Sequence, residues 1–144
     1  MKWITRERIR MDRAASAWLI VRFVDTDAEF EFVPTKGALE LAHARNGVPF
    51  VIPGAELSRK GDKVTFDAIL EKYGLSDAAL HNLALIVREA DIRGDASVSP
   101  EAPGFRAIIH GFFLLNMPDS DTLKLELPIF DALYRFCQRK NVSD

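Results

Sequence analysis

The order of apolar and polar positions in the first third of the chain predicts two strands with a buried helix between them. Residues 2–5 alternate between apolar and polar side chains, and so does "AEFEFVP" at residues 28–34, as in half-buried strands. Between these strands, every residue from Ala14 to Val24 is small or apolar except Ser16 and Arg22. A helix that is apolar on all sides belongs in a core, so this segment is predicted to be buried.

Turn residues and apolar periodicity place further elements along the chain. "VPFVIPG", residues 48–54, is a short run that contains two prolines, which predicts an edge strand. The predicted helices span residues 11 or 12 to about 24 with Asp12 as N-cap, 38–45, 66–73, 76 to about 90 with Ser76 as N-cap, 105–116, and 125–140 with Pro128 near its first turn. Residues 91–104 are predicted to be a polar loop. The order predicts one α/β or α+β domain over residues 1–144, with a small sheet of short strands and a helix-rich C-terminal half.

Composition narrows the classes of protein that fit. With 144 residues, 48% of them apolar, the chain can build a real core, and its net charge of −2 argues against nucleic-acid binding by bulk electrostatics. A small basic pocket for an anion is still compatible with that charge. No apolar run approaches the roughly 18–20 residues of a membrane span. The single cysteine, Cys137, excludes an intramolecular disulfide and fits a reducing compartment. We therefore expect a cytoplasmic protein without direct nucleic-acid or membrane binding, and a homo-oligomer is compatible with the sequence.

The usual catalytic motifs are absent from the sequence. It contains no glycine-rich phosphate loop, no HExxH and no paired-cysteine metal motif, and Cys137 lies on an amphipathic segment where a buried, inert thiol is expected. On the helix predicted from residue 76, His81, Arg88 and Asp91 share one face, so that Arg88 and Asp91 can pair directly. His81 and Asp91 are the candidate metal ligands.

Charges within the apolar opening helix need partners, because a charge in a core is costly unless it is paired. Helical spacing places Arg22 on the same face as Trp18, beside the indole, and Arg13 nearly opposite. One explanation is an internal ion-pair network that locks two helices together and consists of Asp12, Arg13, Arg22, Arg88 and Asp91. The other is a cleft where some of these arginines bind an anion, since the guanidinium fork suits oxyanions. Spacing alone favours the network.

Five blocks of sequence, taken in order, resemble a known family. They are "KWITRERIRMDRAASAWLIVRFVDTDAEFEFVP", "VPFVIPGAELS", "TFDAILEKYGL", "LALIVREADI" and "LPIFDALYRFC". Together they cover essentially the whole chain and resemble the chromate-resistance protein family, a domain found at the C-terminal end of chromate-responsive regulators and fused to rhodanese-like modules. The resemblance implies a cytoplasmic bacterial protein linked to chromate or related oxyanion stress. The family-like positions are Asp12, Arg13, Trp18, Arg22, Asp67, Arg88 and Asp91.

The chain departs from the family pattern at two places. Ser16 and Ala17 stand where the family often has Cys-Pro, so a thiol redox role at that position is not expected. Arg59 and Lys60 follow the "ELS" block, where the family tends to have a histidine, so a metal site that used this histidine would be absent or altered.

Three hypotheses for function follow. In the first, an accessory or sensing domain binds a small oxyanion such as chromate or sulfate; its site residues are Arg13, Arg22 and Arg88, with Trp18 as an apolar wall and Asp12, Asp91 and Asp67 as supporting carboxylates. In the second, a metal-dependent redox or detoxifying enzyme uses a divalent transition metal near His81 and Asp91. In the third, the chain is a structural subunit whose buried ion pairs only fix helix packing.

Overall fold

A small parallel sheet and a helical layer make up the computed structural model, which describes residues 1–93 and 99–140. Strand β1 (Lys2–Arg6) lies between β2 (Glu29–Val33) and β3 (Val48–Pro49), and both neighbours are parallel to it. The predicted edge position of residues 48–54 is thereby confirmed for β3. The α+β class and the β-α-β-α-β order followed by helices are also confirmed.

Side chains on β1 alternate between two apolar clusters, as the period of a strand requires. Trp3 packs into the main core, whereas Ile4 packs into a smaller cluster with helix α2 (Ala38–Ala44). Gly47, just before β3, lies so close to β1 that a Cβ atom there would clash with the Ile4 side chain. The sheet therefore has an apolar layer on each face, with α2 covering one of them.

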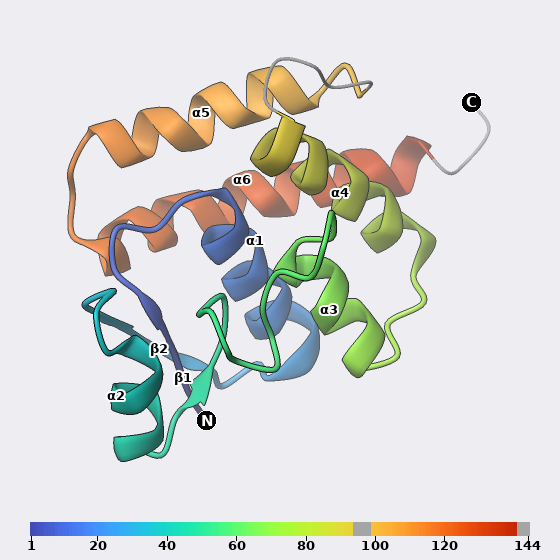
Figure 1. Ribbon diagram of the computed structural model, residues 1–144. Coiled ribbons are helices and arrows are strands. Elements are labelled where there is room, and N and C mark those ends of the chain that lie inside the picture. Colours follow the sequence, from blue (N-terminus) through green and yellow to red (C-terminus); the bar gives the residue numbers. More distant parts are fainter. Residues whose placement is uncertain (94–98, 141–144) are drawn as a thin grey trace.

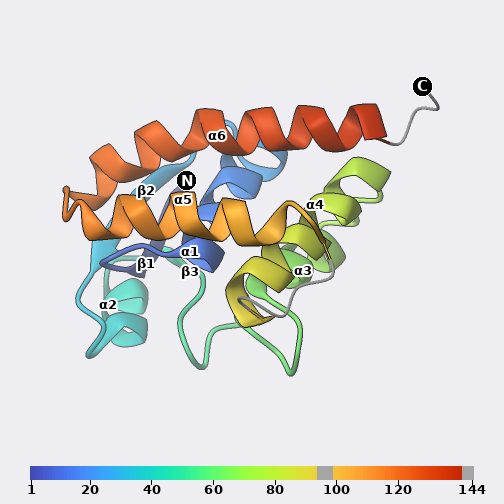
Figure 2. The same ribbon diagram turned by 90° about the horizontal axis from the view of Figure 1, so that it is seen from above.

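The remaining elements form the helical layer (Figures 1 and 2). They are α1 (Met11–Leu19), the π-helical segment η1 (Ile20–Val24), α3 (Thr65–Lys72), α4 (Ala78–Arg88), the π-helical segment η2 (Glu89–Arg93), α5 (Ala102–Leu114) and α6 (Asp119–Lys140). Helix α1 runs through the middle and packs against α3, α4 and α6. Helices α5 and α6 lie side by side in both views.

Burial of α1 matches the apolar pattern from which it was predicted. Every residue from Ala14 to Ile20 is at most 1% exposed. Farther on, the π-helical segment is only partly buried, and Arg22 is exposed. Cys137 is fully buried in the same core, as expected, and burial raises the pKa of its thiol.

Several predicted helix ends are corrected by the structure. Asp12 is not an N-cap, because Arg10 occupies that position. Helix α4 is capped by Asp77 rather than Ser76, since the Asp77 carboxylate accepts a hydrogen bond from the Ala79 amide at 2.8 Å. Helix α6 begins at Asp119 instead of residue 125, so Pro128 lies inside it and removes one backbone hydrogen bond there.

The predicted loop at residues 91–104 is shorter than expected. Segment η2 extends to Arg93 and α5 already begins at Ala102, while residues 94–98 lie outside the described part of the chain. Among the described helices, none has the length and apolar character needed to cross a lipid bilayer.

Candidate functional site: an arginine-lined cavity

Five arginines line one cavity of about 630 Å³ between the sheet end of the fold and the helical layer. The charged and aromatic residues around it are Arg6, Arg10, Asp12, Arg13, Arg59, Asp91, Arg106, His110 and Phe113. The apolar wall includes Met11, Val51, Ile52 and Ile109. With His110 counted as neutral, the described lining residues include five positive and two negative side chains, which gives them a formal charge of +3.

The turn before α1 holds two of these arginines in place. Asp119, at the start of α6, accepts hydrogen bonds from the backbone amides of Arg8 and Ile9 at 2.9 and 3.0 Å. This contact ties the turn to the α5–α6 connection. Arg10 then lies with its guanidinium 4.2 Å from the centre of the Phe113 ring, a cation–π contact. Arg13 follows in the first turn of α1 and donates to the Arg8 carbonyl at 2.7 Å.

Arg13 lies close to two other cations of the cavity, Arg6 and Arg10. Burial, together with repulsion from Arg6 and Arg10, lowers the pKa of its guanidinium to about 10, although Asp119 and Asp12 act in the opposite direction. Its Nε is buried and has no hydrogen-bond partner among the described residues. A guanidinium that loses solvation next to two other cations is stabilised by any anion that enters. The cavity therefore favours negatively charged ligands.

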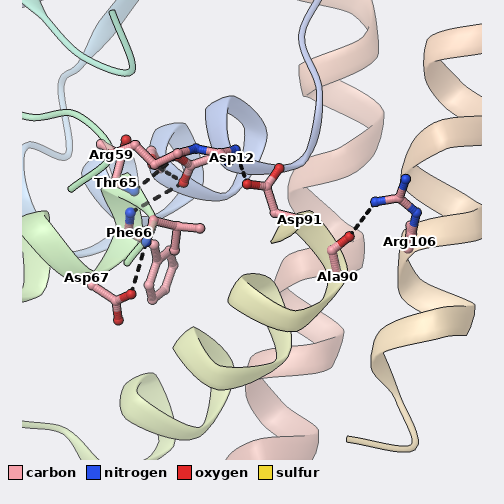
Figure 3. A network of polar contacts seen from close by, with 10 residues as sticks. Asp12, Arg59, Thr65, Phe66, Asp67, Ala90, Asp91 and Arg106 are labelled. Carbon is pink, nitrogen blue, oxygen red and sulfur yellow. Dashed lines mark hydrogen bonds and ion pairs between the residues drawn. The ribbon is translucent and has the colours of Figure 1, made fainter. Parts of the chain in front are cut away.

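Asp91 lies between arginines from two different parts of the fold (Figure 3). Its side chain, 11% exposed, forms an ion pair with Arg59, while Arg106 from α5 donates to the neighbouring Ala90 carbonyl at 2.7 Å. Burial raises the pKa of the Asp91 carboxyl, and repulsion from Asp12 acts in the same direction. The cations that partly offset this rise are Arg59, Arg106 and Arg13.

Asp12 has a structural role at the edge of the cavity. Its buried carboxylate accepts hydrogen bonds from the backbone amides of Thr65 and Phe66 at 3.0 and 3.4 Å, at the beginning of α3 (Figure 3). A carboxylate at this position stabilises the positive end of the helix dipole. The charge of Asp12 is therefore directed toward α3, although the residue also lines the cavity.

The segment after β3 forms the apolar wall and contains an unusual backbone conformation. Val51 has φ of 53°, which is rare for a β-branched residue. Two hydrogen bonds stabilise this backbone conformation. The Val51 amide donates to the Leu57 carbonyl at 2.8 Å, and Arg6 Nε donates to the Val51 carbonyl at 3.0 Å. The second bond fixes one of the cavity's arginines, so the strained turn helps to shape the site.

Two predicted site residues lie away from the cavity. The Trp18 indole donates to Asp131 at 2.7 Å, and the Arg22 guanidinium forms a two-bond ion pair with the same carboxylate at 2.9 Å. Trp18 and Arg22 therefore do share a side, as predicted, but their common partner is a residue of α6. Neither is among the residues that line the cavity.

Arg88 and Asp67 form a second pair of charges apart from the cavity lining. Each is partly buried, and the positive charge of Arg88 acts to lower the Asp67 pKa, although burial raises it overall. The predicted direct pairing of Arg88 with Asp91 is wrong, since the ion-pair partner of Asp91 is Arg59. The reason is η2: from Glu89 the backbone follows the wider π-helical turn, so Asp91 no longer continues the face of α4 that carries Arg88.

The candidate metal ligands do not form a cluster. The exposed His81 ring contacts the Leu75 carbonyl at 3.1 Å, and Asp91 is ion-paired in the cavity. Within residues 1–93 and 99–140, no group of three or more histidine, cysteine, aspartate or glutamate side chains could hold a metal ion.

Sequence reasoning did not select six of the residues around the cavity, which are Arg6, Arg10, Arg59, Arg106, His110 and Phe113. Part of the signal was available. Arg106, His110 and Phe113 have the i, i+4, i+7 spacing of one helix face, and arginines recur in "RERIRMDR". Arg59 is one of the two residues, with Lys60, that stand where the family pattern tends to have a histidine, and in the structure Arg59 lines the cavity.

Comparisons with known proteins agree with the resemblance in the sequence. The model of the family described as "ChrB, C-terminal domain" matches residues 3–137. A curated relative, Protein ChrB from Cupriavidus metallidurans, is 33% identical over 139 residues, which are 92% of this chain and 40% of the relative. The chain thus spans less than half the length of that relative. No solved structure matched significantly.

Proposed function

The chain belongs to the family of the ChrB C-terminal domain, which is related to chromate resistance, and we propose that it binds a small oxyanion in the arginine-lined cavity. The ligand class is a tetrahedral dianion such as chromate or sulfate. In this proposal the domain acts as an accessory or sensing module in oxyanion stress, and binding is its primary activity.

The observation that carries the proposal is the excess of arginine around one cavity. Among the described residues, five guanidinium groups and two carboxylates line the cavity, and one of the two carboxylates, Asp12, is engaged with the amides of α3. Arginine forks form paired hydrogen bonds with oxyanions. An oxyanion near Arg13 would relieve the repulsion that this side chain experiences from Arg6 and Arg10.

The site revises the set of anion-binding residues predicted from the sequence. Arg13 is retained, and Asp91, predicted as a supporting carboxylate, is ion-paired with Arg59 in the cavity. Arg59 and Arg106 replace Arg22 and Arg88, because the former pair lines the cavity and the latter pair does not. Since sulfate and chromate have the same charge and a similar shape, arginine forks alone predict similar affinities for both.

Isothermal titration calorimetry with sulfate and with chromate tests this function. Saturable binding is expected in the wild type, weakened by added salt because the attraction is largely electrostatic. Arg59→Gln removes a half-exposed guanidinium from the cavity and should weaken binding at least about tenfold, the loss of one charge-assisted contact. Circular dichroism checks that the variant is folded, because Asp91, 11% exposed, loses its ion-pair partner. No reductant is needed, since the only cysteine is buried.

The matched control is Arg22→Gln. Arg22 is also exposed and ion-paired, but with Asp131 outside the cavity, so its replacement should leave the affinity for both anions unchanged. Equal losses of affinity in the Arg59 and Arg22 variants would show that binding follows overall charge rather than this cavity. The absence of saturable binding in the wild type would reject the function.

A further inference from the structure

The cavity is much larger than the oxyanion proposed to bind in it. A tetrahedral oxyanion has five heavy atoms and occupies about three water volumes, or roughly 100 Å³. The cavity volume of about 630 Å³ is instead in the range of pockets that take organic ligands of drug size. A single oxyanion leaves most of this space to water. A larger ligand in this remaining space would extend the proposed function, and its assignment rests on that function, because the ligand enters the same cavity.

The two ends of the cavity differ in chemistry along α5. Arg106, His110 and Phe113 all line it from this helix, and seven residues of helix span about 10 Å. At the Arg106 end are Arg59 and Asp91, which are ion-paired with each other. At the other end are the rings of His110 and Phe113, with the Arg10 guanidinium over Phe113. The lining therefore suits a ligand with an anionic part and a ring rather than a compact sphere.

The ring end is already ordered by stacking. His110 lies parallel to Phe113, with ring centres 5.7 Å apart and an interplanar angle of 16°. One face of the imidazole is therefore turned away from Phe113, and the side chain is exposed. Arg10 is fixed over the same phenyl ring. Planar side chains held in this way are the type of surface on which nucleobases stack.

The charge of the lining matches more than one anionic group. The described lining has a formal charge of +3, and its arginines reach the cavity from five parts of the chain: β1, the turn before α1, α1 itself, the loop after β3, and α5. A phosphate ester gains its last charge at a pKa of about 6, so a nucleoside diphosphate carries about three negative charges at neutral pH. Such a ligand would neutralise the lining.

We propose that the cavity binds a nucleoside diphosphate or triphosphate, with the phosphates near Arg13, Arg59 and Arg106 and the base at His110. A tetrahedral oxyanion then occupies the phosphate part of the same site. Single-stranded nucleic acid is disfavoured as the ligand, because the chain as a whole is acidic and the arginines surround one cavity.

Calorimetric titrations with ADP, pyrophosphate, adenosine and sulfate, under identical buffer and salt, test this inference. ADP should bind at least about fivefold more tightly than pyrophosphate, because stacking of one base contributes about 1 to 3 kcal/mol. His110→Ala should reduce the affinity for ADP to that for pyrophosphate. The affinities for pyrophosphate and for sulfate should be the same as in the wild type. His43→Ala is the control, since His43 is an exposed histidine on α2 that does not line the cavity.

Each outcome separates the two proposals. Equal affinities for ADP and pyrophosphate overturn the nucleotide inference, and sulfate binding that Arg59→Gln weakens then leaves the oxyanion function intact. Base-dependent binding of ADP without measurable sulfate or chromate binding supports the nucleotide site and rejects the oxyanion function. A ten-residue oligothymidylate that binds more tightly than ADP or ATP points to nucleic acid and overturns the inference. Failure of every anion to bind rejects both.

Discussion

Glu126 should make the fold less stable as the pH rises. Glu126 is on α6, and its side chain is buried with 1% exposure. Its Oε1 atom has no hydrogen-bond partner among the described residues. Burial raises the pKa of the carboxyl from 4.5 to about 8, and repulsion from Asp119 contributes to the rise. Because the folded-state pKa is above the unfolded one, the folded protein retains a proton that the unfolded chain releases between these values. Stability is fully present below pH 4.5 and is lost as the pH rises through 8.

The size of the effect follows from the two pKa values. Linkage gives a loss of about 1 kcal/mol at pH 5, about 3 kcal/mol at pH 7 and about 4 kcal/mol at pH 8. Glu126→Gln keeps the shape of the protonated acid but cannot ionise. The variant should therefore lack this pH dependence and, at pH 7, be more stable than the wild type by up to about 3 kcal/mol.

Urea denaturation followed by circular dichroism at pH 5, 6, 7 and 8 measures this difference. The free energy of unfolding of the wild type should fall relative to that of Glu126→Gln by about 3 to 4 kcal/mol over the series. Glu71→Gln, at an exposed position on α3, is the control and should follow the wild type. A difference between wild type and Glu126→Gln that is constant from pH 5 to pH 8 would refute the reasoning, whatever its sign.

Three further predictions concern the cavity and the core. Asp12→Asn should lower the free energy of unfolding measured by urea denaturation by about 1 kcal/mol, because it removes the negative charge from the start of α3. The same variant should bind sulfate more tightly in calorimetry, since the cavity loses a negative charge, and weaker binding would contradict the assigned charge balance. Asp91→Asn should also tighten sulfate binding, because it frees Arg59, and unchanged affinity would place the anion away from this ion pair. Cys137 should react with Ellman's reagent only after unfolding in urea, since burial both shields the thiol and raises its pKa; rapid reaction of the native protein would contradict its place in the core.

The elements of the fold were largely predictable, because they depend on local patterns. The all-apolar segment from Ala14 predicted the central helix, and the alternation in "AEFEFVP" predicted β2. Helix ends were less predictable. Asp119 lies six residues before the predicted start of α6 and is there engaged with the amides of Arg8 and Ile9, more than a hundred residues away in the chain.

The cavity was not predictable from spacing, because the residues that form it meet only in the tertiary structure. Arg6, Arg59 and Arg106 come from a strand, a loop and a helix, so no sequence interval connects them. Arg22 was wrongly assigned to the site because its ion-pair partner, Asp131, is 109 residues away in the chain and could not be recognised from helical spacing. The prediction that Arg88 and Asp91 share one helix face was wrong for a different reason, because the backbone changes to π-helical geometry at Glu89.

The most direct test of the central claim is to locate a bound anion. A crystal of the protein soaked in chromate should show an anomalous peak from chromium in the cavity, within hydrogen-bonding distance of Arg13 and Arg59, and an excess of sulfate should remove it. A peak elsewhere, for example at the surface lysines Lys60 and Lys63, with an empty arginine cavity, would contradict the account.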